Sequence, residues 1–327
     1  MSVVAKSNYV DIVAPSRLHF GLLSFGHSVG RQYGGVGVMV KQPSLHIRIS
    51  PATEFTVTGP LSERVIEFVD RWSQAECGGQ RPSCRVDVKQ APRCHIGLGS
   101  GTQLGMSLAC GLNHLLDRND RSPVQLARSV GRGRRSAIGT YGFIQGGLLA
   151  EAGKSNGDEL SKLSHRIEMP SAWRFLLIMD RSKVGLSGND EKNAFSSLPA
   201  VPRDLTRMLR QEIEERLVPA AKMADFSQFS TSLYRYGHSA GMCFAPQQGG
   251  PYQGDQATAI VAALQAMGVQ GVGQSSWGPT LFALLPDAEI AKSIAAQLAH
   301  QFDRARYEMI ITAVSNTGAR VEMISQG

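Results

Sequence analysis

A glycine-rich loop followed by an apolar helix is the segment whose residue types most directly suggest chemistry. Residues 96–102 read Ile-Gly-Leu-Gly-Ser-Gly-Thr, and residues 102–116 have the apolar period of a helix. Glycines let the backbone turn its N–H groups toward an anion, and the start of a helix adds a partial positive charge. The pattern predicts a phosphate-binding loop that is not a Walker A loop, because no Gly-Lys-Ser/Thr is present. An ordinary glycine turn capped by Thr102 is the alternative.

Two basic segments supply groups suited to an anionic ligand. Arg17 and His19 flank Leu18, so on a strand their side chains share one face. Arg17 offers a planar fork for phosphate or carboxylate, and His19 is a candidate proton carrier. The second segment, 130–140, contains three arginines, the last of which is Arg135, followed by Ser136. The alternative is that both segments are solvent-exposed surface, where the same residue types are common.

Two later segments carry groups suited to an aromatic or metal-bound ligand. Residues 271–280 read Gly-Val-Gly-Gln-Ser-Ser-Trp-Gly-Pro-Thr. The hydroxyls of Ser275 and Ser276 can bind polar groups, and the ring of Trp277 can face a flat aromatic molecule, although a core tryptophan is the alternative. Glu191 lies in the segment 185–195, where a carboxylate either meets a ligand or stabilises a helix N-terminus.

The loop and these segments together resemble a known superfamily. Gly97-Leu98-Gly99-Ser100 is similar to the phosphate loop P-x-x-x-G-L-G-S-S-A of the GHMP kinase superfamily, with four residues after Pro92 and with Gly101-Thr102 in place of Ser-Ala. The Ser-Arg-Leu-His string that ends at His19, the basic segment 130–140 and the Gly-Gln-Ser-Ser-Trp-Gly-Pro string resemble the β-ribofuranosylaminobenzene 5′-phosphate synthase family. The kinases carry a catalytic Asp in the region of the basic segment, whereas here no Asp or Glu lies between Asp120 and Glu151.

The resemblance implies an activity and a set of site residues. The synthase family condenses 5-phosphoribosyl 1-pyrophosphate with 4-aminobenzoate, or with 4-hydroxybenzoate, and releases carbon dioxide and pyrophosphate in tetrahydromethanopterin biosynthesis. Mg²⁺ on the pyrophosphate is the expected cofactor, no redox cofactor is expected, and the metal ligands are left unassigned. The implied phosphate-binding residues are Gly97, Leu98, Gly99, Ser100, Gly101 and Thr102. The implied catalytic residues are Arg17, His19 and Arg135, and the implied substrate-binding residues are Ser136, Glu191, Ser275, Ser276 and Trp277.

Two other functions remain open at this stage. The phosphate loop would also suit an ATP-dependent small-molecule kinase, although a carboxylate base is not evident. A non-catalytic protein that binds a phosphate ligand would need the loop but none of the catalytic residues.

The elements that must position these residues predict an α+β fold. The first half reads mainly as strands, among them 9–14 and 18–23 separated at Pro15, with helices expected over 61–75 and 102–116. The second half is more helical, with a helix expected over 226–242 and strands over 281–285 and 307–313. A soft boundary at Pro170 gives two domains, 1–170 with the phosphate loop and 171–327. The resemblance implies the two-domain GHMP-kinase-like fold, with the active site in the cleft between the domains.

Composition narrows the class of protein further. The chain has 327 residues and a net charge of +7, from 34 Lys+Arg against 27 Asp+Glu, which suits anionic small-molecule substrates. Aromatic residues make up 7% and form no stacking motif, so a nucleic-acid partner is not expected. Five cysteines without a C-x-x-C pair, no apolar signal core in residues 1–9 and no membrane-spanning run predict a cytoplasmic protein. The resemblance also allows a homodimer.

Overall fold

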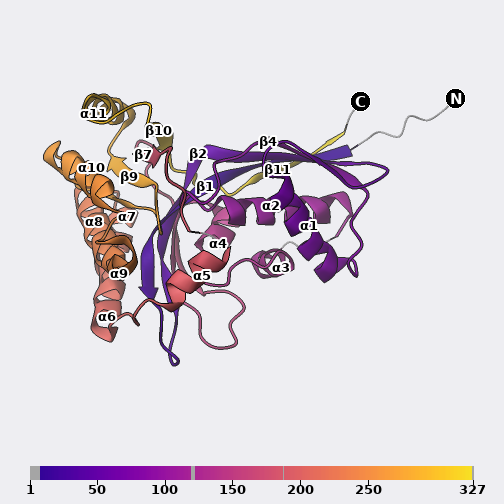
Figure 1. The fold of residues 1–327 in the computed structure, drawn as a ribbon, viewed down its shortest axis with the longest axis horizontal. Helices are drawn as coiled ribbons and strands as arrows, with labels where there is room; N and C mark the ends of the chain where they lie inside the picture. Colours follow the sequence, from indigo (N-terminus) through magenta and orange to yellow (C-terminus); the bar gives the residue numbers. More distant parts are fainter. Residues whose placement is uncertain (1–7, 119–121, 187, 326–327) are drawn as a thin grey trace.

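Two β-sheets organise the computed structural model, which describes residues 8–118, 122–186 and 188–325 (Figure 1). Within these residues the first sheet has the order β11-β1-β2-β4-β3, and β5 joins it beside β2 and carries β6. Its strands are β1 (Asn8–Ser24), β2 (Tyr33–Pro51), β3 (Thr56–Thr58), β4 (Cys84–Gln90), β5 (Leu148–Glu151), β6 (Leu163–Ile167) and β11 (Arg320–Ser325). The second sheet has the order β10-β7-β9-β8 and consists of β7 (Arg174–Asp180), β8 (Val272–Gln274), β9 (Leu281–Leu285) and β10 (Tyr307–Ala313).

Helices from the first half of the chain cover one face of the first sheet. They are α1 (Ser62–Glu76), α2 (Ser100–Leu115), α3 (Pro123–Ser129) and α4 (Ile138–Gln145). Phe68 and Trp72 of α1 and Leu104 of α2 pack in one buried cluster with Ile12 of β1 and Ile47 of β2. This packing fixes α2, and therefore the loop that precedes it, against the sheet.

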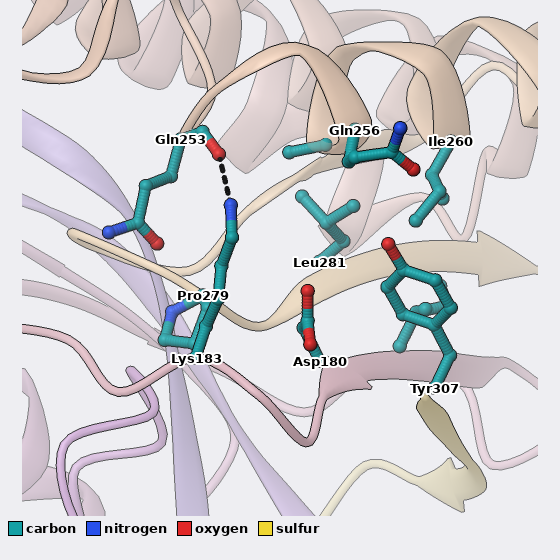
Figure 2. Close-up of a pocket in the computed structure, with 10 residues that line it drawn as sticks. Asp180, Lys183, Gln253, Gln256, Ile260, Pro279, Leu281 and Tyr307 are labelled. Atoms are coloured by element: carbon teal, nitrogen blue, oxygen red, sulfur yellow. Dashed lines mark hydrogen bonds between the residues drawn. The ribbon is translucent and has the colours of Figure 1, made fainter. Parts of the chain in front are cut away.

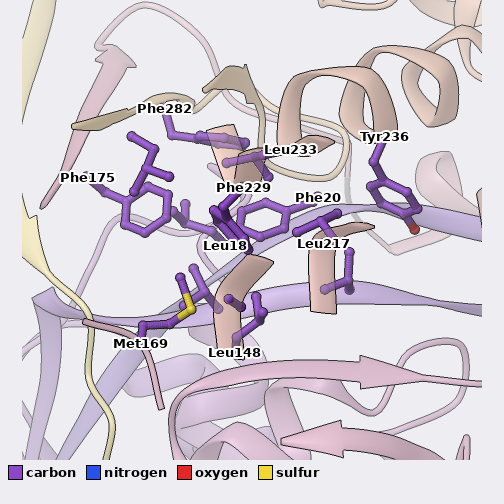
Figure 3. Packing of buried hydrophobic residues seen from close by; sticks show 14 of the residues in the cluster. Leu18, Phe20, Leu148, Met169, Phe175, Leu217, Phe229, Leu233, Tyr236 and Phe282 are labelled. Carbon is purple, nitrogen blue, oxygen red and sulfur yellow. The ribbon is translucent and has the colours of Figure 1, made fainter. Parts of the chain in front are cut away.

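The second half of the chain adds a further set of helices. They are α5 (Gly188–Ser196), α6 (Arg203–Gln211), the π-helix η1 (Glu212–Leu217), α7 (Val218–Lys222), α8 (Phe226–Met242), α9 (Ala245–Gln248), α10 (Asp255–Ala266) and α11 (Ala288–Gln301). Figure 3 shows how Phe20 of β1 meets Phe175 of β7 and Phe282 of β9, with ring centroids 6.3 and 5.2 Å away. Phe229 of α8 lies in the same cluster.

The two halves of the chain share elements. The long strands β1 and β2 are antiparallel. The first residues of β1 and the later residues of β2 therefore join the cluster under α1 and α2, whereas the later residues of β1 and the first residues of β2 join the cluster of Figure 3. The last strand, β11, pairs with β1 rather than with the second sheet. The boundary at residue 170 stays a prediction, and the chain crosses between the two sheets more than once.

Two local predictions were wrong. Pro15 does not separate two strands, because it lies at a bulge in β1 between Ala14 and Ser16, where a proline interrupts pairing without ending the strand. Helix α2 begins at Ser100 rather than at Thr102, and its cap residue is Gly99, without a side-chain cap. Thr102 therefore lies inside the first turn and does not cap the helix.

No helix in the described ranges is long and apolar enough to cross a membrane.

Candidate active site

The loop over residues 96–102, predicted to bind phosphate, contains two glycines in a backbone conformation that favours glycine. Gly97 has a φ of +87° and Gly99 a φ of +71°, both in the left-handed region. A Cβ on Gly97 would stand 2.5 Å from the carbonyl oxygen of Ser275. Ser100 then opens α2, whose positive end faces the loop. The side chain of Leu98 is buried in the core, so only its backbone can meet a ligand.

Segments distant in sequence hold this loop from both sides. The backbone N–H of Arg17 donates to the Leu98 carbonyl at 2.9 Å. The Ser275 hydroxyl donates to the Gly97 carbonyl at 2.7 Å and accepts from the backbone N–H of His19 at 3.0 Å. Since Ser275 is fully buried, its hydroxyl clamps β1, the loop and the segment 271–280 together. A contact between Ser275 and the substrate stays a prediction.

Three arginines converge on the loop and the start of α2. The Nη2 atoms of Arg132 and Arg64 lie 2.9 and 3.1 Å from the point that a Cβ on Gly101 would occupy. The Nε atom of Arg17 lies 3.3 Å from the corresponding point on Gly99. Each of the three Nε atoms is buried and has no hydrogen-bond partner among the described residues. Arg64 Nη1 is also 2.9 Å from Nε2 of His95. We call Arg17, Arg64, His95, Arg132 and Arg135 the cationic cluster.

The positive charges of this cluster repel one another. Burial lowers the pKa of Arg132 to about 10, and the charges of Arg64 and Arg71 act in the same direction. Burial likewise lowers the pKa of Arg17 to about 10, so both arginines stay protonated at neutral pH. The pKa of His95 falls through burial and the charge of Arg64. Such a group of like charges is stabilised by an anion, and a helix start beside it adds to the attraction.

Arg135 belongs to the cluster but has a carboxylate partner. Its guanidinium is ion-paired with Glu191 and lies 4.5 Å above the ring of Phe195. Glu191 and Phe195 are one turn apart on α5 and therefore share a face. The structure thus brings together two predicted site residues, Arg135 and Glu191, that are 56 positions apart.

Trp277 lies in an aromatic cluster next to this ion pair. Its ring centroid is 4.8 Å from that of Phe244 and 6.0 Å from that of Phe195. Trp277 and Ser276 are half-buried, so neither is sealed in the core. The aromatic cluster consists of Phe25, Tyr33, Phe195, Phe244 and Trp277.

A buried polar chain lies behind the basic segment. Nδ1 of His19 accepts from the backbone N–H of Gly21 at 3.3 Å, so the ring proton is on Nε2, which is 3.1 Å from the Ser136 hydroxyl. Burial and the charge of Arg17 hold the pKa of His19 well below its ordinary value, and the ring is neutral. Glu151 accepts from the backbone N–H of Ala137 at 2.8 Å. Burial raises the pKa of Glu151 to about 7, against the effect of the nearby Ser136 hydroxyl.

Sequence reasoning missed several of these groups. Arg64 was not singled out, because the helix pattern of α1 gives no sign that its first turn faces a loop formed by residues 97–101. His95 and Arg132 adjoin predicted motifs, so their positions were a usable signal. Glu151 was noted only as the end of a stretch without carboxylates, and its isolation in an apolar strand was the signal of a buried acid.

A small pocket on the second sheet is separate from this site. It is lined in part by Asp180, Lys183, Gln253 and Tyr307, and Lys183 donates to the Gln253 carbonyl at 3.0 Å (Figure 2). Its volume of about 10 Å³ accommodates a single water and excludes a substrate.

The described residues contain no group of three or more His, Cys, Asp or Glu side chains that could hold a metal ion. The carboxylate nearest to the cationic cluster, Glu191, is already paired with Arg135. The donor set therefore does not match a metal site built by the protein alone.

The chain is similar over nearly its whole length to proteins named β-ribofuranosylphenol 5′-phosphate synthase. It is 28% identical to the one from Archaeoglobus fulgidus, covering 94% of this chain and 98% of that protein. It is 27% identical to the one from Methanothermobacter thermautotrophicus, covering 94% and 97%. No protein-family model matches the chain.

Solved structures establish the fold. A homoserine kinase from Cytophaga hutchinsonii superposes with a TM-score of 0.69 at 16% identity, covering 98% of this chain and 99% of that one. A mevalonate diphosphate decarboxylase from Staphylococcus aureus superposes with a TM-score of 0.64 at 16% identity, covering 97% and 98%. The predicted α+β class and GHMP-kinase-like fold are confirmed.

Proposed function

We propose that this relative of the β-ribofuranosylphenol 5′-phosphate synthases, built on the GHMP kinase fold, is a decarboxylating phosphoribosyltransferase. It joins carbon 1 of 5-phosphoribosyl 1-pyrophosphate to a 4-substituted benzoate and releases carbon dioxide and pyrophosphate. The relatives are named for a ribosylated phenol. A phenol product requires a 4-hydroxyl on the acceptor, so we propose 4-hydroxybenzoate as the first candidate acceptor and 4-aminobenzoate as the second.

The observation that carries the proposal is the convergence of Arg64 and Arg132 on Gly101. A reaction that expels pyrophosphate needs positive charge where the leaving group develops its own. The arginines and the start of α2 supply that charge in a fixed position. Their buried Nε atoms have no hydrogen-bond partner among the described residues, so no carboxylate there neutralises these two side chains at Nε.

The bond changes assign a task to each part of the site. The bond between ribose carbon 1 and the pyrophosphate oxygen breaks, and its electron pair leaves with pyrophosphate onto the loop and the arginines. The ring carbon that bears the carboxylate forms the new bond to carbon 1. The bond to the carboxylate then breaks, carbon dioxide leaves and the electron pair restores the aromatic ring. The protein chiefly holds the two reactants in line.

The remaining predicted residues position the acceptor. The aromatic cluster around Trp277 offers a flat face to the benzoate ring. Arg17 packs against Gly99 of the loop and is suited to the benzoate carboxylate or to a phosphate. His19 and Ser136 keep their mutual hydrogen bond and fix the basic segment beside β1.

Mg²⁺ bound to the pyrophosphate stays a prediction. The described carboxylates near the loop do not form a metal site, so none of the bond changes above involves the ion.

Release of labelled carbon dioxide from carboxyl-labelled acceptors tests the proposal. Purified protein with Mg²⁺, 5-phosphoribosyl 1-pyrophosphate and 4-hydroxybenzoate should release it only when the ribosyl donor is present, and 4-aminobenzoate in parallel ranks the acceptors. Folded protein that releases none with either acceptor contradicts the proposal. Parallel reactions with ATP and homoserine or mevalonate would reveal a kinase instead.

A further inference from the structure

The carboxylate of Glu191 lies at the cationic cluster, in which Arg64 and Arg132 are proposed to hold pyrophosphate. It is ion-paired with Arg135, with about a third of each side chain exposed. Its charge also raises the pKa values of Arg17, His95 and Arg132 against the effect of burial. Among the described carboxylates, Glu191 is the one whose charge acts on all of these members of the cationic cluster.

The helix that carries Glu191 has few contacts with the rest of the described fold. In the part of the chain that the structure describes, no helix or strand packs extensively against α5. Phe195, in the aromatic cluster and under the Arg135 guanidinium, is the apolar contact that attaches it. Asn189 and Asp190, on the same helix, are exposed. The ion pair of Glu191 is therefore a local contact and not a part of the core.

We propose that Glu191 is a resident anion of the cationic cluster, which the diphosphate group of the substrate must displace from Arg135. The residue then determines specificity, because a ligand binds only if its contacts with the cluster are more favourable in free energy than those of the carboxylate. A diphosphate has several charged oxygens and can contact two or more guanidiniums at once, whereas a single carboxylate or a monophosphate replaces Glu191 with little gain. The inference rests on the proposed function only for the identity of the anion.

Titration calorimetry with inorganic pyrophosphate measures this competition without turnover. Glu191→Gln keeps the size and hydrogen-bonding capacity of the side chain and removes its charge. With EDTA present and at roughly physiological salt, where charges beyond about 8 Å are screened, the variant should bind pyrophosphate about fivefold more tightly than wild type, or roughly 1 kcal/mol. The matched control is Asp190→Asn, which makes the same change in net charge on an exposed neighbour and should leave the dissociation constant within about twofold.

The outcomes separate this inference from its alternatives. Unchanged or weaker binding by Glu191→Gln with an unaltered unfolding midpoint overturns it, and so does an equal gain in Asp190→Asn, which would indicate a general charge effect. If Glu191 instead holds Mg²⁺, the variant should lose affinity only when Mg²⁺ replaces EDTA, and that result also overturns it. Tighter binding in a protein that releases no carbon dioxide would support the inference and contradict the proposed reaction.

Discussion

Gly97 lies where the phosphate loop touches the segment 271–280, so alanine at this position tests whether the loop geometry is required. The residue has a φ of +87°, and an added Cβ would meet backbone oxygens of Ser275 at 2.5 Å and of Gly278 at 3.1 Å. Neither contact can be relieved by rotating a side chain. Either the loop or the 271–280 segment must move, and the hydroxyl clamp of Ser275 moves with it.

The magnitude follows from separating two costs. A left-handed backbone costs a non-glycine residue about 1–2 kcal/mol, and forced overpacking adds about 1–3 kcal/mol. Gly97→Ala should therefore destabilise the fold by roughly 2–5 kcal/mol. Gly157→Ala is the matched control, because Gly157 has a φ of +93° and open space around its Cβ position. It should show only the backbone cost, about 1–2 kcal/mol.

Two measurements on both variants decide the matter. Denaturant unfolding gives the free energy of unfolding, and titration with pyrophosphate gives the affinity of the loop. Gly97→Ala should bind pyrophosphate at least about tenfold more weakly, a loss of about 1.4 kcal/mol, whereas Gly157→Ala should bind like wild type. Equal stability and equal affinity in the two variants would refute the proposed loop geometry.

Three further predictions follow from the site. Arg132→Met should lower kcat/KM for the ribosyl donor by about 100-fold, or roughly 3 kcal/mol, while Arg128→Met on the exposed face of α3 should stay within about twofold; steady-state kinetics on both checks this. Burial raises the pKa of Glu151 to about 7, so the folded state holds this proton more tightly than the unfolded state, and the wild type should lose about 3 kcal/mol of stability as the pH rises from about 4.5 to about 7. Glu151→Gln should not show this loss, and denaturant unfolding of both proteins across this pH range is the test. Trp277→Leu should raise KM for the aromatic acceptor by about tenfold and leave pyrophosphate affinity unchanged, as acceptor titrations and calorimetry can show.

Regular elements were predictable where the apolar period was strong. The helix expected over 226–242 is α8, and the strands expected over 281–285 and 307–313 are β9 and β10, with the same bounds. Helix α4 was missed because Gly139 and Gly142 lower its helix propensity. Packing explains these glycines, since a Cβ on Gly142 would stand 2.2 Å from Sδ of Met39. Tertiary contact, which the local pattern does not contain, decides this helix.

The candidate site was predictable only where one segment carries the chemistry. The glycines and hydroxyls of residues 97–102 predict an anion site by themselves. Arg64 joins that site only because α1 packs beside α2, and Glu191 meets Arg135 only because α5 folds back on the basic segment. Such encounters depend on the path of the chain between the elements, which residue types and spacing do not specify.

Release of carbon dioxide from carboxyl-labelled 4-hydroxybenzoate, with and without 5-phosphoribosyl 1-pyrophosphate, tests the central claim most directly. We expect release that requires the ribosyl donor, yields one pyrophosphate for each carbon dioxide and falls sharply in Arg132→Met. Folded wild-type protein that binds pyrophosphate but releases no carbon dioxide from either 4-hydroxybenzoate or 4-aminobenzoate would contradict it.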